Sequence, residues 1–365
     1  MRLIISSFKI PRWFSATPAA LGLTLFLAGC GGGTGTSAGT SLPPLTSTAA
    51  PFIFSPYKDV GISLNWNTDV ISTNVSGTLQ PMLDVLPAGN KAVTLAFATG
   101  ECGSASETWA GINPDALAQA NVSNFSAKNI NYILSTGGSA GVFTCGTDAG
   151  MTTFIQRFAS KNLIGVDFDI EGGQTPAQIQ DLVQRVKNMQ PLYPNLRWSF
   201  TLATLAPADN APQGVKSDAL NFYGDTVMKA IQTVGLTNYT INLMTMDYGS
   251  ASPANCAMQT GAATCDMGQS AIQAARSLHE FWGVPYAQIE LTPMIGGNDT
   301  PDETFTLQNV STVAPWAKAN GLAGLHFWSF DRDKDCPPGA AQPICNSYGQ
   351  AGVLGFDQAF ISALQ

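Results

Sequence analysis

The chain has 365 residues, of which 45% are hydrophobic and 12% are charged, so it can bury the core of one large domain or two small ones. The formal net charge is −8 and no cluster of lysine and arginine occurs, which argues against a nucleic-acid partner. A neutral or cationic substrate suits this charge balance better.

The N-terminal residues are predicted to form a targeting signal. Basic residues in the first twelve positions precede an apolar run over residues 19–28, which is too short to span a bilayer. The run ends in Leu27-Ala28-Gly29-Cys30, which resembles a bacterial lipobox. This resemblance implies a signal peptide over residues 1–29 and lipid attachment at Cys30. An ordinary signal peptide with a chance cysteine is the alternative.

Residues 30–50 follow as a segment rich in glycine, serine and threonine. The segment has no apolar periodicity, so we expect a flexible tether. Residues 51–365 are left as one folded domain. We therefore expect an exported, monomeric lipoprotein that is held at the membrane of the cell envelope, with secretion as the alternative.

Strand-like runs alternate with helix-like stretches through the folded part. The predicted strands span residues 59–66, 92–99, 131–135, 161–171, 197–204, 240–247, 290–295 and 323–330. The predicted helices span residues 77–86, a stretch from 114, 151–160, 175–190, 218–234, 270–282, a stretch ending near 318, and 356–364. Such alternation implies parallel strands with right-handed crossovers, and eight units in one domain predict a (β/α)8 TIM barrel. A doubly wound open sheet is the alternative, but the first strand lacks a glycine-rich phosphate loop after it.

The fourth predicted strand carries three acids at alternating positions. Asp167, Asp169 and Glu171 leave the same face of the strand, and the residues between them are apolar. Carboxylates inside a protein are costly unless they share protons, meet hydrogen-bond donors or carry out chemistry. Because the C-terminal ends of barrel strands hold the active site, we expect Glu171 at the mouth and the other two acids beneath it. An exposed edge strand with a solvated acidic face is the alternative.

Six cysteines lie in the folded part, and an even number in an exported protein favours disulfides. The connectivity is open, but proximity in the sequence favours Cys256–Cys265 and Cys336–Cys345, which leaves Cys102–Cys145. No Cys-x-x-Cys pair occurs and only two histidines are present, so a zinc site is not expected.

Four segments, in chain order, resemble signatures of the glycoside hydrolase family 18 chitinases. Residues 165–171 resemble the fourth-strand signature, 135–138 the Ser-x-Gly-Gly of the third strand, 244–249 the Met-x-Tyr-Asp region of the sixth, and 327–331 the eighth strand. The resemblance covers residues 51–365. It implies retaining, substrate-assisted hydrolysis of chitin or other β-1,4-linked N-acetylglucosamine polymers, with no metal or organic cofactor.

The resemblance also implies roles for the three acids. Glu171 is expected to protonate the glycosidic oxygen and later to activate water, while the 2-acetamido oxygen of the substrate attacks the anomeric carbon. Asp169 is expected to orient the acetamido group, and Asp167 to share a proton with Asp169. Because stacked carboxylates cannot all ionise, Glu171 can hold a proton at the working pH.

Other site residues are expected from the same resemblance. Trp328 is expected at the floor of the sugar site, with Met244 and Asp247 as further substrate contacts. The chain departs from the family at Ile164, where the family has its first Asp, and at Met246, where many relatives have a tyrosine. Tyr248 is expected to supply the missing hydroxyl.

Aromatic and polar residues near the strand ends have two interpretations. Trp66 and Trp109 are either sugar-stacking surfaces or packing residues, and His326 is expected to be a satisfied core histidine. Residues 298–299 and Asp331 are weak candidates for binding sugar hydroxyls. Two other functions stay open: an endo-β-N-acetylglucosaminidase acting on glycoprotein glycans, and a non-catalytic, chitinase-like carbohydrate-binding protein.

Overall fold

The computed structural model describes residues 51–139, 141–208 and 218–365. The predicted signal peptide, the tether and Cys30 lie outside these residues, so the lipid anchor stays a prediction. In the part of the chain that is described, no helix has both the length and the apolar character needed to cross a bilayer.

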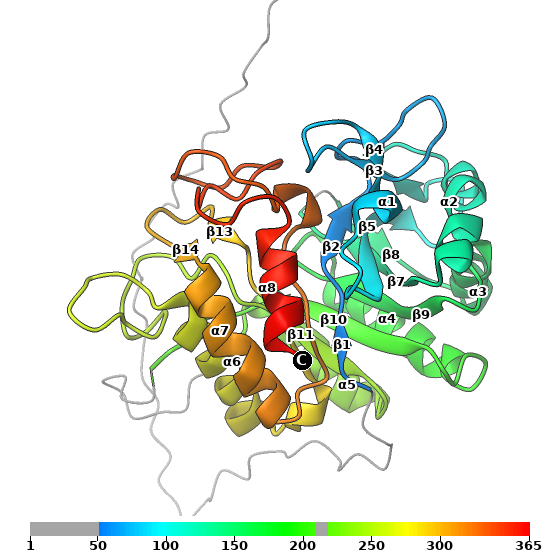
Figure 1. Ribbon diagram of the computed structural model, residues 1–365. Coiled ribbons are helices and arrows are strands. Elements are labelled where there is room, and N and C mark those ends of the chain that lie inside the picture. Colours follow the sequence, from blue (N-terminus) through cyan, green and yellow to red (C-terminus); the bar gives the residue numbers. More distant parts are fainter. Residues whose placement is uncertain (1–50, 140, 209–217) are drawn as a thin grey trace, which may run out of the picture. The chain divides into compact units, whose positions relative to one another are not determined.

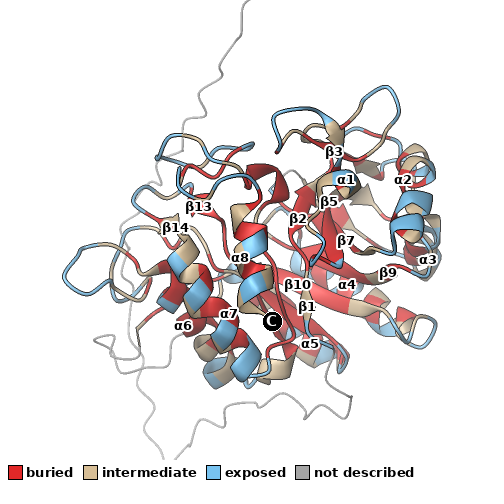
Figure 2. Ribbon diagram, viewed as in Figure 1, coloured by how far each residue is buried: buried red, intermediate tan, exposed pale blue. Residues whose placement is uncertain are grey.

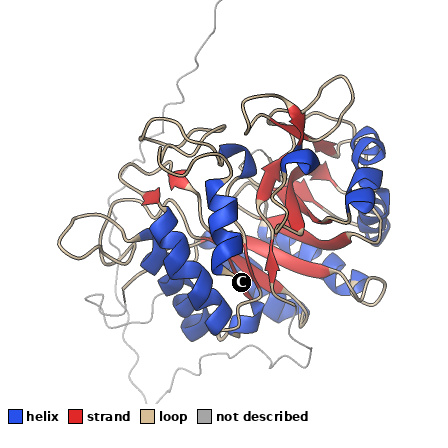
Figure 3. Ribbon diagram, in the orientation of Figure 1, coloured by secondary structure: helices blue, strands red, loops and turns tan. Residues whose placement is uncertain are grey.

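The described residues form a curled parallel sheet covered by helices, a TIM-barrel-like fold as predicted (Figures 1 and 3). The strands of this sheet are β1 (Ile53–Phe54), β2 (Tyr57–Asp59), β5 (Ala92–Glu101), β7 (Asn131–Gly137), β9 (Leu163–Asp169), β10 (Arg197–Ala203), β11 (Thr240–Met244), β12 (Ile289–Thr292) and β15 (Gly324–Leu325). Each pairs in parallel with the next along the sheet.

The first strand joins the two ends of the sheet, with Pro56 at the change of partner. β1 pairs with β15, and β2 pairs with β5. The Tyr57 N–H donates to the Phe327 carbonyl at 3.0 Å, while the Thr94 N–H donates to the Pro56 carbonyl at 2.9 Å. The predicted first strand at residues 59–66 was wrong. The strand β2 ends at Asp59, because the Asp59 side chain accepts from the Gly61 N–H at 2.9 Å and the chain turns there.

The helices cover the outer face of the sheet with their buried sides (Figure 2). They are α1 (Met82–Val85), α2 (Pro114–Lys128), α3 (Asp148–Arg157), α4 (Pro176–Met189), α5 (Phe222–Val234), α6 (Met267–Trp282), α7 (Leu307–Ala319) and α8 (Gly355–Ala363). Side-chain caps define several starts: Thr175 forms a capping box with Gln178 before α4, as its place ahead of Pro176 suggested.

Short elements decorate the C-terminal end of the sheet. β3 (Ser72–Thr73) pairs with β4 (Gln80–Pro81), and β13 (Gly296–Gly297) pairs with β14 (Thr304–Phe305), both antiparallel. β6 (Thr108–Trp109) and β8 (Phe143–Thr144) extend β5, while η1 (Tyr286–Gln288) and η2 (Phe330–Arg332) are single 3-10 turns. All of these pieces except η1, which directly precedes β12 at the N-terminal end of the sheet, build the walls above the strands.

The disulfide pairing expected from sequence proximity is confirmed. The bonds are Cys102–Cys145, with Cα atoms 5.0 Å apart, and Cys256–Cys265 and Cys336–Cys345, each with Cα atoms 5.7 Å apart. All three lie in connections that follow a strand. Cys102–Cys145 links the connections after β5 and β7, Cys256–Cys265 lies in the connection after β11, and Cys336–Cys345 lies in the connection after β15. They therefore fasten the loops at the C-terminal ends of the strands.

Burial decides between the two interpretations of His326 and of Trp109. His326 is buried, with Nδ1 2.8 Å from the Ser55 carbonyl and Nε2 3.0 Å from Glu290, which also pairs with Arg197. It is a satisfied core histidine, as expected. Trp109 is fully buried between core phenylalanines and is a packing residue.

A buried ion pair connects β2 with η2, the 3-10 turn that follows β15. Lys58 Nζ lies 2.6 Å from Asp331 and also donates to the carbonyls of Asp59 and Ile62. Thr73 donates to the second Asp331 oxygen at 3.0 Å. Both Asp331 oxygens are thus occupied by protein donors, and Asp331 does not line the cavity described below, so the structure does not support its binding of sugar hydroxyls.

Substituting Lys58 by methionine is expected to lower the free energy of unfolding by about 3–5 kcal/mol, because it leaves the Asp331 carboxylate buried without its partner. Urea unfolding followed by tryptophan fluorescence measures this. The matched control is Lys128→Met, which breaks a half-exposed pair with Asp84 and should cost less than about 1 kcal/mol. Equal losses in the two variants would contradict the role given to the buried pair.

Candidate active site

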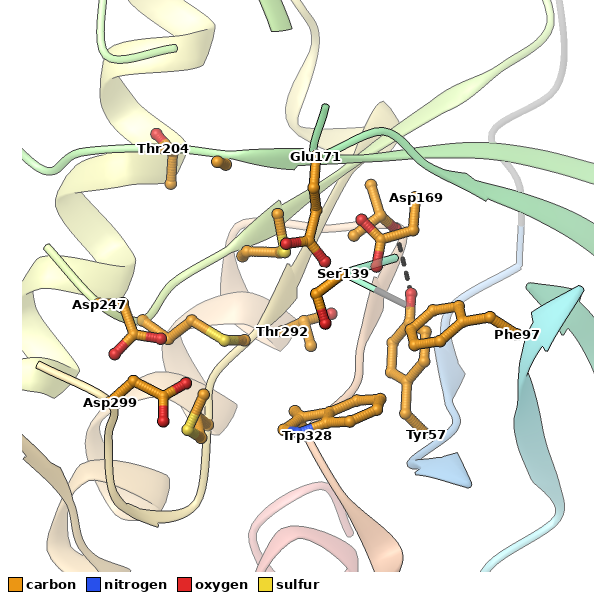
Figure 4. A pocket seen from close by; sticks show the side chains of 15 residues that line it. Tyr57, Phe97, Ser139, Asp169, Glu171, Thr204, Asp247, Thr292, Asp299 and Trp328 are labelled. Carbon is orange, nitrogen blue, oxygen red and sulfur yellow. Dashed lines mark hydrogen bonds between the residues drawn. The ribbon is translucent and has the colours of Figure 1, made fainter. Parts of the chain in front are cut away.

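A cavity opens at the C-terminal ends of the barrel strands (Figure 4). Its volume is about 270 Å³. Two of the three predicted acids line it, together with residues from seven other segments. The residues that matter for its chemistry are Tyr57, Asp169, Glu171, Asp247, Asp299 and Trp328. The structure thus brings the end of β9 and the end of the eighth strand to one site.

Asp167 is the deepest acid and is held by hydroxyl groups from three other strands. Ser199 and Thr201 donate to one carboxylate oxygen, each at 2.7 Å, while Ser135 at 2.6 Å and Tyr57 at 2.9 Å donate to the other. Burial raises the pKa of Asp167, and these four hydrogen bonds oppose the rise. The predicted proton sharing with Asp169 is not seen as a hydrogen bond between described residues, because both oxygens already have donors.

Asp169 lies one layer higher and faces the cavity. It is 4% exposed, and its Oδ1 has no hydrogen-bond partner among the residues described. Burial, with the nearby Glu171 and Asp167, raises the pKa of Asp169 well above its ordinary value. Buried polar atoms normally have hydrogen-bond partners, so this Asp169 oxygen is free to accept from a bound ligand as far as the described residues show.

Glu171 follows the last residue of β9 by two positions, so it keeps the orientation of the acids below it and reaches the cavity. Burial raises its pKa, the backbone of Ser139 opposes the rise, and the charge of Asp247 adds to it. A carboxyl group with a raised pKa at the mouth of a cavity is suited to general acid catalysis.

An aromatic floor closes the cavity below the acids. The Trp328 ring stacks on Phe97 with centroids 5.5 Å apart and planes at 17°, and Tyr57 lies 6.2 Å away. Gly138 makes room for this floor, because a Cβ there would lie 2.8 Å from the Phe97 ring, and its φ is +68°. At Gly137 a Cβ would lie 2.1 Å from the Asp169 carbonyl oxygen. The two glycines thus allow both the floor and the acid strand to approach.

The sixth strand places Met244 and Asp247 in the cavity, as predicted, and adds Met246. It does not bring Tyr248 there. β11 ends at Met244 and Asp247 has φ +53°, so the alternation of side chains stops before Tyr248. Tyr248 is 1% exposed, and it is absent from the cavity wall. The prediction for the Tyr248 hydroxyl assumed that side chains alternate as far as residue 248, but the strand ends at Met244.

Of the weaker candidates, Asp299 lines the cavity and Trp66 does not. Trp66 is 62% exposed in the turn that follows the first strand, and its stacking role stays a prediction. Asn298 is buried and donates to the carbonyls of Met294 and Gly296, so it supports the loop. The missed cavity residues include Tyr57 and Phe97. Their common signal is an aromatic residue within or at the end of a barrel strand.

The chain is similar in sequence to two curated chitinases over part of its length. Endochitinase 11 of Metarhizium anisopliae is 29% identical over 185 residues, which are 47% of this chain and 33% of that protein. The probable bifunctional chitinase/lysozyme of Escherichia coli is 28% identical over 183 residues, which are 47% of this chain and 19% of that protein. The matches thus span a third of one relative and a fifth of the other. No protein-family model matches the chain.

Solved structures of chitinases share the fold. The catalytic domain of a hyperthermophilic chitinase from Pyrococcus furiosus aligns with a TM-score of 0.64 and 24% identity, covering 87% of this chain and 97% of that one. Catalytic-site mutants of active domain 2 of a thermostable chitinase from the same organism, complexed with chito-oligosaccharides, align at 0.63 and 23% identity, covering 88% and 97%. The described part of this chain therefore has a chitinase-like, TIM-barrel-like fold with a cavity at the ends of its strands.

Proposed function

We propose that this chain is a retaining glycoside hydrolase that cleaves β-1,4-linked N-acetylglucosamine polymers with assistance from the substrate's own acetamido group. One observation carries the proposal: Asp169, with an unpartnered buried oxygen, and Glu171 line the same cavity as Trp328. The chitinase relatives and the shared fold support the substrate class.

The first half of the reaction uses the two upper acids. Glu171 gives its proton to the glycosidic oxygen, so the bond to the anomeric carbon breaks and the leaving sugar departs as an alcohol. The acetamido oxygen of the substrate bonds to the anomeric carbon from the other face. The acetamido nitrogen then becomes positively charged, and its N–H donates to Asp169 Oδ1, whose ionised form this charge favours.

The second half returns the site to its starting state. Glu171, now ionised, takes a proton from a water molecule whose oxygen attacks the anomeric carbon and opens the intermediate. Two inversions give net retention of configuration. The aromatic floor made by Trp328 and Phe97 packs against the apolar face of the sugar and excludes water from below.

Substituting Asp247 by asparagine is expected to move the alkaline limb of the kcat/KM profile to lower pH. Activity needs protonated Glu171 and is lost as pH rises through its pKa, which the charge of Asp247 raises. Removing that charge lowers the pKa, so the limb shifts downward. Glu101→Gln is the control, since Glu101 lies outside the cavity wall. An unmoved limb in Asp247→Asn, or equal shifts in both variants, would contradict the assignment of the limb to Glu171.

The substrate is decided by a product profile. Hydrolysis of chitohexaose, with products that keep the β-configuration when first released, is the expected result. Cleavage of a high-mannose glycopeptide in preference to chitohexaose would identify an endo-β-N-acetylglucosaminidase instead. Binding of the oligosaccharide without release of product would identify a carbohydrate-binding protein.

A further inference from the structure

Two neighbouring aromatic residues open α5 just outside the cavity. Phe222 is 64% exposed, and its ring meets the ring of Tyr223 edge to face, with centroids 5.3 Å apart and planes at 81°. The Asn221 side chain caps the helix by accepting from the N–H groups of Tyr223 at 3.0 Å and Gly224 at 2.9 Å. The first turn of α5, and with it the aromatic pair, is thereby fixed in place.

The pair is joined to the residues around Glu171. The Gly173 N–H donates to the Tyr223 hydroxyl at 3.2 Å, and the Tyr223 ring lies 3.6 Å from the position of a Cβ on Gly172. These two glycines directly follow Glu171 in the chain. The Tyr223 side chain thus contacts the two residues that directly follow Glu171.

A second connection reaches the cavity through the chain before α5. Leu220 forms an antiparallel bridge with Thr204, which lines the cavity. In Figure 4, Thr204 and Glu171 lie on the side of the cavity opposite Trp328. Phe222 therefore lies two residues beyond the residue that pairs with the cavity wall at Thr204, and Tyr223 bonds to the chain two residues beyond Glu171.

The occupant of this surface follows from the size of the cavity and the chemistry of its wall. At about 270 Å³ the cavity lies at the small end of ligand sites, which hold roughly 300–1,000 Å³, so most of a longer oligosaccharide must lie outside it. An exposed aromatic ring that is held in place offers a flat apolar surface to a ligand. The apolar face of a pyranose ring is a matching partner, and a neutral sugar chain brings no charge into conflict with the nearby acids.

We propose that Phe222, supported by Tyr223, is a stacking platform for one pyranose ring of a longer N-acetylglucosamine chain whose scissile bond lies at Glu171. This inference rests on the proposed function and adds a binding site to it. It makes the protein selective for long chains over short ones. Tyr223 is a positioning residue in this arrangement, because its hydroxyl holds Gly173 while its ring orients Phe222.

The test compares Phe222→Ala with the wild type on two substrates, an aryl chitobioside and chitohexaose. We expect KM for chitohexaose to rise about tenfold, the loss of one aromatic stacking contact, while kcat/KM for the aryl chitobioside stays within about twofold. Phe222→Trp should restore the KM for chitohexaose. Leu192→Ala is the matched control, since Leu192 is also 64% exposed but lies between α4 and β10, at the opposite end of the strands.

An unchanged KM for chitohexaose, or equal losses on both substrates, would overturn the platform while leaving the hydrolase intact. If the wild type hydrolyses neither substrate, the proposed function fails. The affinity for chitohexaose then tests separately whether Phe222 is a stacking platform. Calorimetry with chitohexaose then compares Glu171→Gln with the double variant Glu171→Gln/Phe222→Ala. About tenfold weaker binding by the double variant supports the platform, and equal affinity or no binding by either variant rejects it.

Discussion

Glu171→Gln is expected to lower kcat on chitohexaose by about 10²–10⁴-fold, the usual contribution of a general acid. Glutamine has nearly the same shape but no acidic proton, so the leaving oxygen must depart as an alkoxide. Binding should be retained, because the change leaves the aromatic floor and Asp169 in place. The measurement is initial-rate hydrolysis together with the quenching of tryptophan fluorescence, to which Trp328 in the cavity contributes.

The control for this variant is Glu101→Gln, at the end of β5 and outside the cavity wall. It should keep wild-type turnover. Turnover in Glu171→Gln that stays within about threefold of the wild type would remove this residue from the mechanism, whatever the fold suggests. Loss of both binding and turnover would instead indicate that the carboxyl group shapes the cavity.

Asp169→Asn is expected to lower kcat by about 10²–10³-fold, the range measured when one preorganised group is lost from a site where charge develops. The asparagine can still fill the space, but it cannot ionise as the acetamido nitrogen becomes positive. In the wild type, burial raises the pKa of Asp169, so the ionised carboxylate depends on the positively charged substrate for a partner. The effect should appear in kcat more than in KM, because the charge exists only after attack has begun.

A substrate lacking the acetamido group gives the decisive comparison for Asp169. Wild-type protein should turn over the 2-hydroxy analogue of an aryl chitobioside very slowly, and Asp169→Asn should reduce that residual rate little further. A large additional loss on the analogue would mean that Asp169 acts on something other than the acetamido group. The same pair of substrates also tests substrate assistance itself, since equal wild-type rates on both would contradict it.

The alternation of the three acids predicted the core of the site because it is a local property. Side chains leave a strand on alternate faces wherever the strand lies, so Asp169 and Glu171 had to share a face, and the parallel order of the strands placed that face inside a barrel. The same pattern could not predict the four hydroxyl groups that donate to Asp167. They come from β2, β7 and β10, and only packing brings these strands around one carboxylate.

Two misplacements have a backbone cause. The first strand was predicted at residues 59–66, but Asp59 accepts from the Gly61 N–H at 2.9 Å and turns the chain there, so β2 ends where the predicted strand begins and Tyr57 was missed. Asp247 adopts a left-handed conformation that asparagine and aspartate tolerate, and this turn cancels the parity that pointed Tyr248 inward. In both places a turn at an aspartate ends the strand alternation on which the prediction depended.

The three disulfides divide the molecule into a part that needs oxidation and a part that does not. Every bond lies above the strands, and none connects one barrel strand to another. The sheet is therefore held by hydrogen bonds and packing alone, whereas the rim of the cavity also has covalent cross-links, which form only where thiols are oxidised. We therefore expect reducing conditions to loosen the rim of the cavity before they affect the strands beneath it.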